Sequence, residues 1–234
     1  MTPTRVIVYY TDSALPSPLA AECWRSLLAN AAPVGAHLVA VSHAPPPVDW
    51  PRANLVAEIV PTGAERCPRQ IYENIAAGLD AAAKLTPRPD YAYLAEHDCL
   101  YLDAHFAGNI EVPTRVCYDC QAARLTRQGW ILHHRPLLSA VCGPLDLLRA
   151  VARERREHCR AGHRYVWGEF GVGDSIEGRT FAIGVGSIEP RVIDVRWGRN
   201  FTGGTRAGET IDELRGWGHW RDTWTRLGGL EAYL

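Results

Sequence analysis

The acidic triplet Glu96-His97-Asp98 is the strongest chemical signal in the chain, because it follows directly on an apolar run at residues 91–95. Two carboxylates separated by one residue at the end of a buried strand can point their oxygens toward one place when the chain turns. Mg²⁺ and Mn²⁺ prefer oxygen ligands, and Mg²⁺ usually takes one or two carboxylates together with substrate phosphates. We therefore predict a divalent metal site formed by Asp98 and Glu96, with His97 as a further candidate ligand. The alternative is a polar strand end whose acids are only solvated.

Strands and helices alternate over the first 100 residues, and their order predicts where the triplet lies. Continuous apolar runs predict buried strands, and apolar residues at helical spacing predict helices. The expected order is strand 6–10, helix 19–28, strand 36–42, strand 55–60, helix 71–85 and strand 91–95. Such alternation implies a mostly parallel sheet, in which ligands bind beyond the carboxyl ends of the strands. Thr11 and Asp12, which follow the first strand, should therefore share one rim with the triplet.

The second half of the chain is less regular. We expect a hairpin-like pair of strands at 115–118 and 129–133, a long helix at 137–156, and short strands at 183–185 and 192–195. The remaining tail is irregular and rich in Gly, Arg and Trp. Neither an internal repeat nor a linker divides the chain, so we predict a single α/β domain over residues 1–234.

Composition narrows the class of protein. A chain of 234 residues with 47% hydrophobic and 22% charged residues is ordinary for a globular domain. Its longest apolar runs are far shorter than the roughly 20 residues that cross a bilayer. The net charge of −1 gives no support for long-range attraction to nucleic acid or to a membrane. Seven cysteines suit a reducing compartment better than a disulfide framework, and the N-terminus lacks a signal-like segment, so we expect a cytoplasmic protein.

The segment Tyr93-Leu94-Ala95-Glu96-His97-Asp98 resembles a signature of the GT-A superfamily of nucleotide-sugar glycosyltransferases, in its family 2-like form. In that superfamily a strand of the form apolar-apolar-apolar-Asp-x-Asp delivers the metal-binding acids, and here Glu stands first. The resemblance covers about residues 5–170 and is strongest between 66 and 101. It implies one Rossmann-like domain with a nucleotide-donor half at 1–101 and an acceptor half and tail at 102–234. It also implies Mn²⁺ or Mg²⁺ as cofactor and a UDP-sugar as the first donor to consider.

Roles for individual residues follow from the resemblance. Asp98 resembles the principal metal ligand, and Glu96 the acid that faces the donor sugar or ribose. Thr11 and Asp12 resemble the positions that meet the nucleoside. The helix before the triplet lies where related enzymes hold the nucleotide, and its candidates for donor binding are Gln70 and Asn74.

The expected catalytic base comes from a weaker match. Trp167-Gly168-Glu169-Phe170 resembles a Gly-Glu-Asp motif whose acid acts as base in inverting transfer, although Phe170 replaces the second acid. A base is required because the acceptor hydroxyl must lose its proton in a one-step displacement. We predict Glu169 in this role, with Asp174 as a second candidate.

One segment departs from the family pattern. Many such enzymes use a histidine near the C-terminus as a metal ligand, whereas residues 192–200 offer Trp197 at that place. Asp194 of this segment, or His97, could substitute as the third ligand. Arg196 and Arg199 could instead bind phosphate oxygens of the donor through forked hydrogen bonds.

These features predict a metal-dependent hexosyl- or pentosyltransferase that acts on an acceptor hydroxyl. The sequence does not identify the acceptor. The Arg- and Trp-rich tail makes hydroxylated DNA bases, of the kind that phages modify, one candidate. The tail's tryptophans either stack on a nucleobase or pack a C-terminal helix against the sheet. Two alternatives are a sugar nucleotidyltransferase, although the loop after the first strand is neither Gly-rich nor basic, and a nucleic-acid-binding α/β protein without catalysis.

Overall fold

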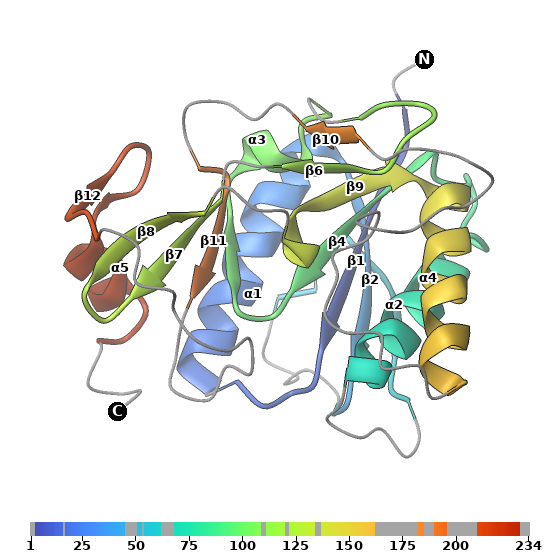
Figure 1. Ribbon diagram of the computed structural model, residues 1–234, viewed down its shortest axis with the longest axis horizontal. Helices are drawn as coiled ribbons and strands as arrows, with labels where there is room; N and C mark the ends of the chain where they lie inside the picture. The colour runs from blue at the N-terminus through green and yellow to red at the C-terminus, as the bar shows by residue number, and fades with distance from the viewer. Residues whose placement is uncertain are drawn as a thin grey trace.

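The computed structural model describes residues 3–15, 17–44, 51–52, 54–61, 68–108, 111–119, 122–133, 137–161, 182–184, 190–195 and 210–229. A seven-stranded sheet in the order β10-β6-β9-β4-β1-β2-β3 forms the centre of the molecule (Figure 1). Its strands are β1 (Arg5–Thr11), β2 (His37–Ser42), β3 (Leu55–Ile59), β4 (Tyr91–Glu96), β6 (Cys117–Asp119), β9 (Val141–Pro144) and β10 (Ala182–Gly184). Neighbouring strands are parallel, except that β9 runs antiparallel to both β4 and β6. The predicted α/β fold with a mostly parallel central sheet is confirmed.

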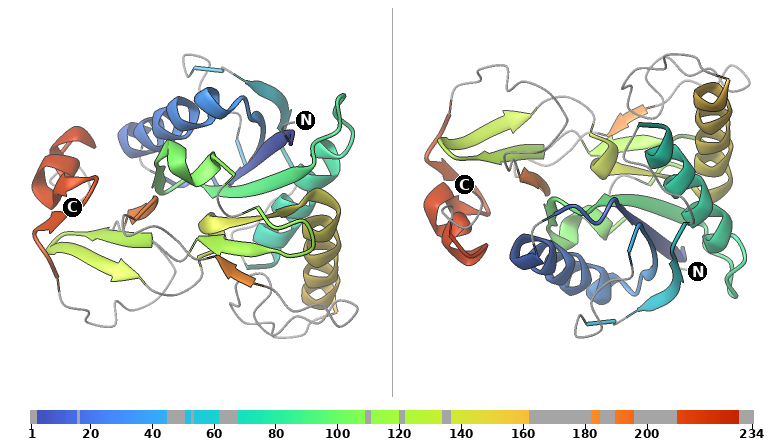
Figure 2. Two further views of the ribbon diagram at one scale, coloured as in Figure 1. Left: turned by 90° about the horizontal axis from the view of Figure 1, so that it is seen from above. Right: turned by 90° about the horizontal axis from the view of Figure 1, so that it is seen from below.

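Helices cover both faces of this sheet. α1 (Ser17–Ala31) packs on one face, and α2 (Pro68–Ala82) and α4 (Leu145–Arg160) lie side by side on the other (Figure 1 and Figure 2). None of the described helices is long and apolar enough to span a membrane. The two helical layers explain why the central strands are buried on both faces.

The residues of β1 show this two-sided burial. Val6 and Val8 belong to the core under α2 and α4, whereas Ile7 and Tyr9 belong to the core under α1. A strand covered on both faces needs apolar residues at every position, which is the continuous run seen in the sequence. Gly78 lets α2 approach β1 closely, since a Cβ at this position would come 2.4 Å from Val8 Cγ1.

A smaller sheet in the order β5-β11-β7-β8 lies to the left of the large one in Figure 1. It comprises β5 (Cys99–Tyr101), β7 (Ala122–Thr126), β8 (Gly129–His133) and β11 (Val192–Val195). A hairpin of β12 (Glu213–Leu214) and β13 (Gly218–His219) and the helix α5 (Trp220–Arg226) pack against its outer end. The short turns η1 (Ala32–Val34), α3 (Asp103–Phe106) and η2 (Leu138–Ala140) complete the described elements. The chain passes from the large sheet to the small one at residues 97–98, within the acidic triplet.

Two predictions for the second half are wrong. The hairpin is formed by β7 and β8, whereas the strand expected at 115–118 corresponds to β6 and lies in the large sheet. The helix expected from residue 137 begins only at Leu145, because η2 and β9 come first. β9 inserts between β4 and β6, and a Cβ at Gly143 would lie 3.2 Å from Val116 Cα. Close packing of non-local strands therefore overrides the local helical pattern.

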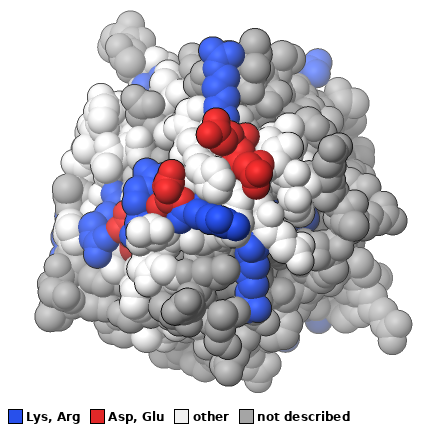
Figure 3. Space-filling view, turned by 90° about the vertical axis from the view of Figure 1, so that its left-hand side faces the viewer, with Lys and Arg blue, Asp and Glu red and all other residues white. Residues whose placement is uncertain are grey.

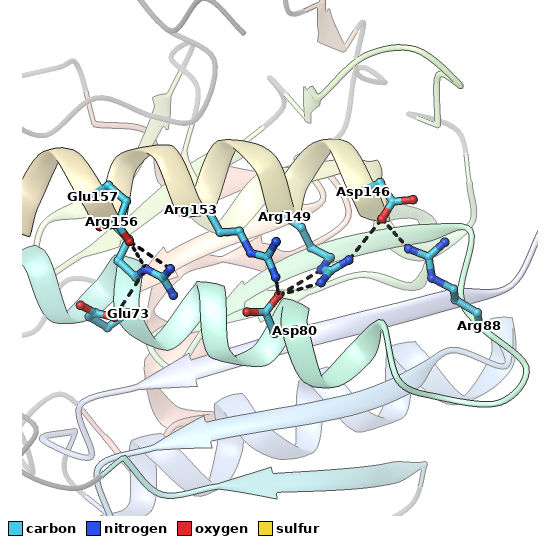
Figure 4. A network of polar contacts seen from close by, with 8 residues as sticks. All are labelled: Glu73, Asp80, Arg88, Asp146, Arg149, Arg153, Arg156 and Glu157. Atoms are coloured by element: carbon cyan, nitrogen blue, oxygen red, sulfur yellow. Dashed lines mark hydrogen bonds and ion pairs between the residues drawn. The ribbon is translucent and has the colours of Figure 1, made fainter.

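A row of ion pairs joins α2 to α4 on the outer surface (Figure 4). We call it the α2–α4 seam, and it consists of Glu73, Asp80, Arg88, Asp146, Arg149, Arg153, Arg156 and Glu157. Asp80 Oδ1 accepts hydrogen bonds from Arg149 Nη2 at 3.0 Å and from Arg153 Nη2 at 2.6 Å. Opposite charges thus alternate along the two helices and hold them together.

The tryptophans of the C-terminal segment pack against the small sheet. Trp220 and Trp224 are buried, and the indole N–H groups of Trp217, Trp220 and Trp224 each donate a hydrogen bond within the chain. On the exposed face of this region, arginine and acidic side chains of the described residues lie next to one another (Figure 3). Of the two roles considered for the tail, the described rings therefore show packing. Trp197 lies outside the described residues.

Candidate active site

Three side chains converge where β4 ends and β5 begins. Glu96, Asp98 and Cys99 each offer one potential ligand atom, and these atoms all lie within 4.8 Å of one another. Asp98 is 8% exposed and Cys99 1% exposed, while Glu96 is half-buried. We call these three residues the acidic tip.

Backbone hydrogen bonds hold the turn that forms the acidic tip. The N–H of Glu96 donates to the Tyr101 hydroxyl oxygen at 2.9 Å. The carbonyl of Asp98 accepts from the N–H of Val195 at 2.8 Å, which ties the turn to β11. Because both contacts come from strands of the small sheet, that sheet positions the acids delivered by the large one.

The end of β1 lies beside the acidic tip, as the rule for parallel sheets predicts. Tyr10 is the register partner of Glu96, so the next residues, Thr11 and Asp12, extend the same rim. Asp12 Oδ1 lies 3.7 Å from His97 Nε2 and accepts a 3.0 Å hydrogen bond from the N–H of Ala14. The imidazole of His97 is therefore close to Asp12. It is not one of the three clustered ligand atoms, the third of which is the sulfur of Cys99.

A hydrogen-bonded chain of polar side chains continues the rim toward β2. Gln70 Nε2 donates to Asn74 Oδ1 at 2.8 Å, and Asn74 Nδ2 lies 3.3 Å from Nε2 of His43. Asn74 is 3% exposed, and the N–H of His43 donates to the carbonyl of Thr11 at 3.3 Å. The two donor-binding candidates on α2 are thus connected to the strand ends through a histidine.

Sequence reasoning missed three residues of this rim. His43 follows the second predicted strand, so the rule that placed Asp12 there would also have placed His43. Cys99 adjoins the triplet, but a thiol is not a preferred ligand for Mg²⁺ or Mn²⁺, so its residue type gave no reason to include it. Tyr101 carried no sequence signal, because its role depends on the fold of β5 back toward Glu96.

Negative charge concentrates at the acidic tip. Burial raises the pKa of the Cys99 thiol, and the carboxylates of Asp98, Asp194 and Glu96 raise it further. Burial likewise raises the pKa of the Tyr10 hydroxyl, with Glu96 as the next largest cause. Carboxylates that disfavour a further negative charge on their neighbours favour a bound cation.

Asp194 reaches the same region from β11, where it is the register partner of both Cys99 and Arg124. Its Oδ2 accepts a hydrogen bond of 3.2 Å from Arg124 Nε, and the residue is 6% exposed. The sequence suggested Asp194 as a substitute metal ligand, and the fold places it beside the acidic tip with its carboxylate held by an arginine.

Four of the predicted site residues lie outside the described residues. They are the candidate bases Glu169 and Asp174 and the candidate phosphate ligands Arg196 and Arg199. The described part of the site can hold a divalent cation and present polar groups along the strand ends. This combination suits a phosphorylated ligand whose oxygens complete the metal coordination.

Comparisons with known proteins give a limited picture. No protein-family model and no curated protein matches the chain. Among the solved structures that match is "a glycosyltransferase involved in the glycosylation of the major capsid of PBCV-1". That match has 10% sequence identity and a TM-score of 0.46, and it covers 87% of this chain and 95% of the other.

Proposed function

We propose that the protein is a metal-dependent glycosyltransferase that moves a hexosyl or pentosyl group from a nucleotide sugar to an acceptor hydroxyl. The observation that carries the proposal is the convergence of Glu96 and Asp98 on one place at the rim where β1 also ends. Carboxylates at the ends of parallel strands can bind a metal ion that is also coordinated by the diphosphate of a ligand.

The acidic tip fits a hard divalent cation. Glu96 and Asp98 would hold Mn²⁺ or Mg²⁺, which prefer oxygen, whereas the Cys99 thiol would suit a softer metal. When bound, such an ion would neutralise the diphosphate and stabilise it as a leaving group. His97, close to Asp12, is proposed as a further ligand or as a group that orients Asp12.

The rest of the rim would bind the nucleoside of the donor, for which a UDP-sugar is our first choice. Thr11 and Asp12 would meet the nucleoside at the end of β1. Gln70 and Asn74 would contact it from α2, and His43 lies between the two groups. Side-chain amides and hydroxyls both donate and accept hydrogen bonds, as recognition of a base and a ribose requires.

The acceptor side of the site is proposed from the sequence. Glu169, or Asp174 in its place, would deprotonate the acceptor hydroxyl, and Arg196 and Arg199 would bind the diphosphate. A hydroxylated base in DNA stays among the acceptors to be tested, although the described tryptophans of the tail pack internally. Glu169→Gln should abolish transfer while leaving donor binding intact, and full transfer by this variant would remove Glu169 from the proposed mechanism.

Thermal unfolding in the presence of UDP-, GDP-, CDP- and dTDP-sugars, with and without Mn²⁺, tests the proposal. A ligand at 100 times its Kd stabilises a protein by about 2.7 kcal/mol, so a cognate donor should raise the Tm clearly. We expect this rise with a UDP-sugar, only when Mn²⁺ or Mg²⁺ is present.

Two variants, each lacking one carboxylate, make the test specific. Asp98→Asn should lose the metal-dependent rise, whereas Asp80→Asn, on the α2–α4 seam, should keep it. If no sugar nucleotide stabilises the protein with either metal, or if the Asp98 variant responds like the wild type, the proposed function is wrong. Binding of DNA without metal or sugar nucleotide would instead favour a non-catalytic nucleic-acid-binding protein.

A further inference from the structure

We propose that a cavity between α1 and the C-terminal region binds one neutral sugar ring. The cavity has a volume of about 80 Å³. It is lined by Glu22 and Ser26 of α1, by Leu100 of β5, and by residues that include Trp217 and Arg226. None of the residues of the acidic tip lines it, so it is a second site and does not depend on the proposed transfer activity.

The apolar part of the cavity is formed by well-packed side chains. Leu100 is 5% exposed, and Leu227, which also lines the cavity, is 2% exposed. The indole N–H of Trp217 donates a 2.8 Å hydrogen bond to the carbonyl of Pro190, which fixes the ring. Ligand pockets combine apolar and aromatic surfaces of this kind with a few polar groups that set orientation. The carbon-bound hydrogens of a sugar ring provide the matching apolar surface.

The polar part of the cavity contains one negatively charged and one positively charged side chain. Glu22 carries a carboxylate that also pairs with Arg25. Arg226 Nη2 donates to the Thr223 hydroxyl oxygen at 2.9 Å, and the guanidinium has further N–H groups. The charges of Glu22 and Arg226 sum to zero. A charged ligand would be attracted by one of these two side chains and repelled by the other, so the lining gives neither an anion nor a cation an advantage over a neutral ligand.

Hydroxyl groups satisfy both of these side chains at once. A hydroxyl donates its hydrogen to a carboxylate and accepts from a guanidinium. The lining also contains Ser26, whose hydroxyl is hydrogen-bonded to the backbone of Tyr101, and Thr223, whose hydroxyl accepts from Arg226. The volume is that of roughly six waters, at about 10–15 Å³ for each. This space is enough for a single polyhydroxylated ring.

Saturation-transfer NMR with the full-length protein tests the proposal, because it detects weak binding directly and needs no transfer activity. The probes are glucose and galactose, their charged relatives glucuronate and glucosamine, and uridine. We expect a neutral hexose to bind with a Kd on the order of 1 mM, as suits a ligand of about a dozen non-hydrogen atoms. Both charged sugars should bind more weakly.

Variants locate the binding. Arg226→Gln and Glu22→Gln should each weaken hexose binding about tenfold, because each removes charged hydrogen bonds. Matched controls are Arg221→Gln, also on α5 but outside the cavity, and Asp98→Asn at the acidic tip; both should bind like the wild type. Loss of hexose binding in the Asp98 variant alone would assign the signal to the acidic tip and overturn the proposal.

Three other outcomes would also overturn it. The first is that neither neutral hexose receives saturation. The second is that Arg226→Gln and Glu22→Gln bind as the wild type does. The third is that uridine or glucuronate binds more tightly than the hexoses. Because none of these results involves metal or donor, the cavity and the proposed transfer activity can fail separately.

Discussion

The acidic tip and the α2–α4 seam both gather charged side chains, but they arrange them differently. On the seam, carboxylates lie against guanidinium groups, as Asp80 does between Arg149 and Arg153 on an outer helical surface (Figure 4). At the tip, two carboxylates and a thiol lie within 4.8 Å of one another and are mostly buried. Opposite charges stabilise a fold, whereas crowded like charges raise its energy until a cation joins them. From this contrast we assign the seam to the scaffold and propose the tip as the functional site.

The largest effect that would separate the two regions is expected for Asp98→Asn. Loss of one of two clustered carboxylates should lower sugar transfer by about a factor of 10² to 10³, the scale of removing one strong electrostatic contact from a transition state. Stability in the absence of metal should stay the same or rise, because like charges are relieved. Transfer assays with the best donor from the thermal screen, together with chemical unfolding, measure both. A clear loss of stability without loss of transfer would reverse the roles given to the two regions.

The variant Tyr101→Phe tests whether the Tyr101 hydroxyl positions the acidic tip. Tyr101 is 1% exposed, and its hydroxyl oxygen is the acceptor for the N–H of Glu96. Removing it leaves a buried N–H unsatisfied, which should cost about 1–3 kcal/mol of unfolding free energy. Metal affinity, measured by titration with Mn²⁺, should fall as well.

A matched control is Tyr93→Phe, because the Tyr93 hydroxyl donates to Glu111 at 3.0 Å away from the tip. This variant should lose stability but keep the metal affinity of the wild type. Equal metal affinities in both variants would show that Tyr101 does not position Glu96.

On the seam, Asp80→Asn should have a smaller effect, and it should lower stability instead of sugar transfer. The side chain of Asp80 is 30% exposed and accepts from two arginines, so its loss should lower the unfolding free energy by about 1 kcal/mol. Transfer and metal binding should not change. Urea unfolding at low and high salt measures the effect, and the difference between the variant and the wild type should shrink at high salt. A change in metal affinity would contradict the separation of the two regions.

The smallest effect concerns pH at the end of the seam. The hydrogen bond from Arg88 lowers the pKa of Asp146 below its ordinary value. A group with a lowered folded-state pKa stabilises the fold above its unfolded pKa, about 4, and this contribution disappears as the pH falls through the folded-state value. Because the side chain is 66% exposed, it should amount to at most about 0.5 kcal/mol.

Unfolding of Asp146→Asn and of the wild type at pH 7 and pH 3 measures this contribution. The variant should be slightly less stable than the wild type at pH 7, and the difference should be smaller at pH 3. Asp222→Asn, an exposed acid on α5, is the control for a general effect of charge. A stability gap that persists unchanged at pH 3 would contradict the ionic origin.

The first half of the fold could be predicted in detail because its signals are local. A strand buried on both faces reads as an apolar run, so β1, β2 and β4 lie within one or two residues of their predicted bounds. β9 could not be predicted in this way, because its sequence, Val141–Pro144, becomes a strand only through insertion between β4 and β6. The pairing of β7 with β8 likewise depends on register between segments, which local periodicity does not contain.

The same distinction between local signals and tertiary contacts applies to the candidate site. By itself, the sequence determined that two acids follow a buried strand and that Thr11 and Asp12 end another, and the geometry of parallel strands was enough to expect them on one rim. Only the tertiary structure decided that Cys99 joins the acids, that His97 lies near Asp12, and that His43 links β2 to Asn74. Side-chain direction at the end of a strand depends on the turn that follows it. Here that turn is held by Tyr101, through the fold of β5 back toward Glu96, and by Val195, which is distant in sequence, and no local pattern reveals either contact.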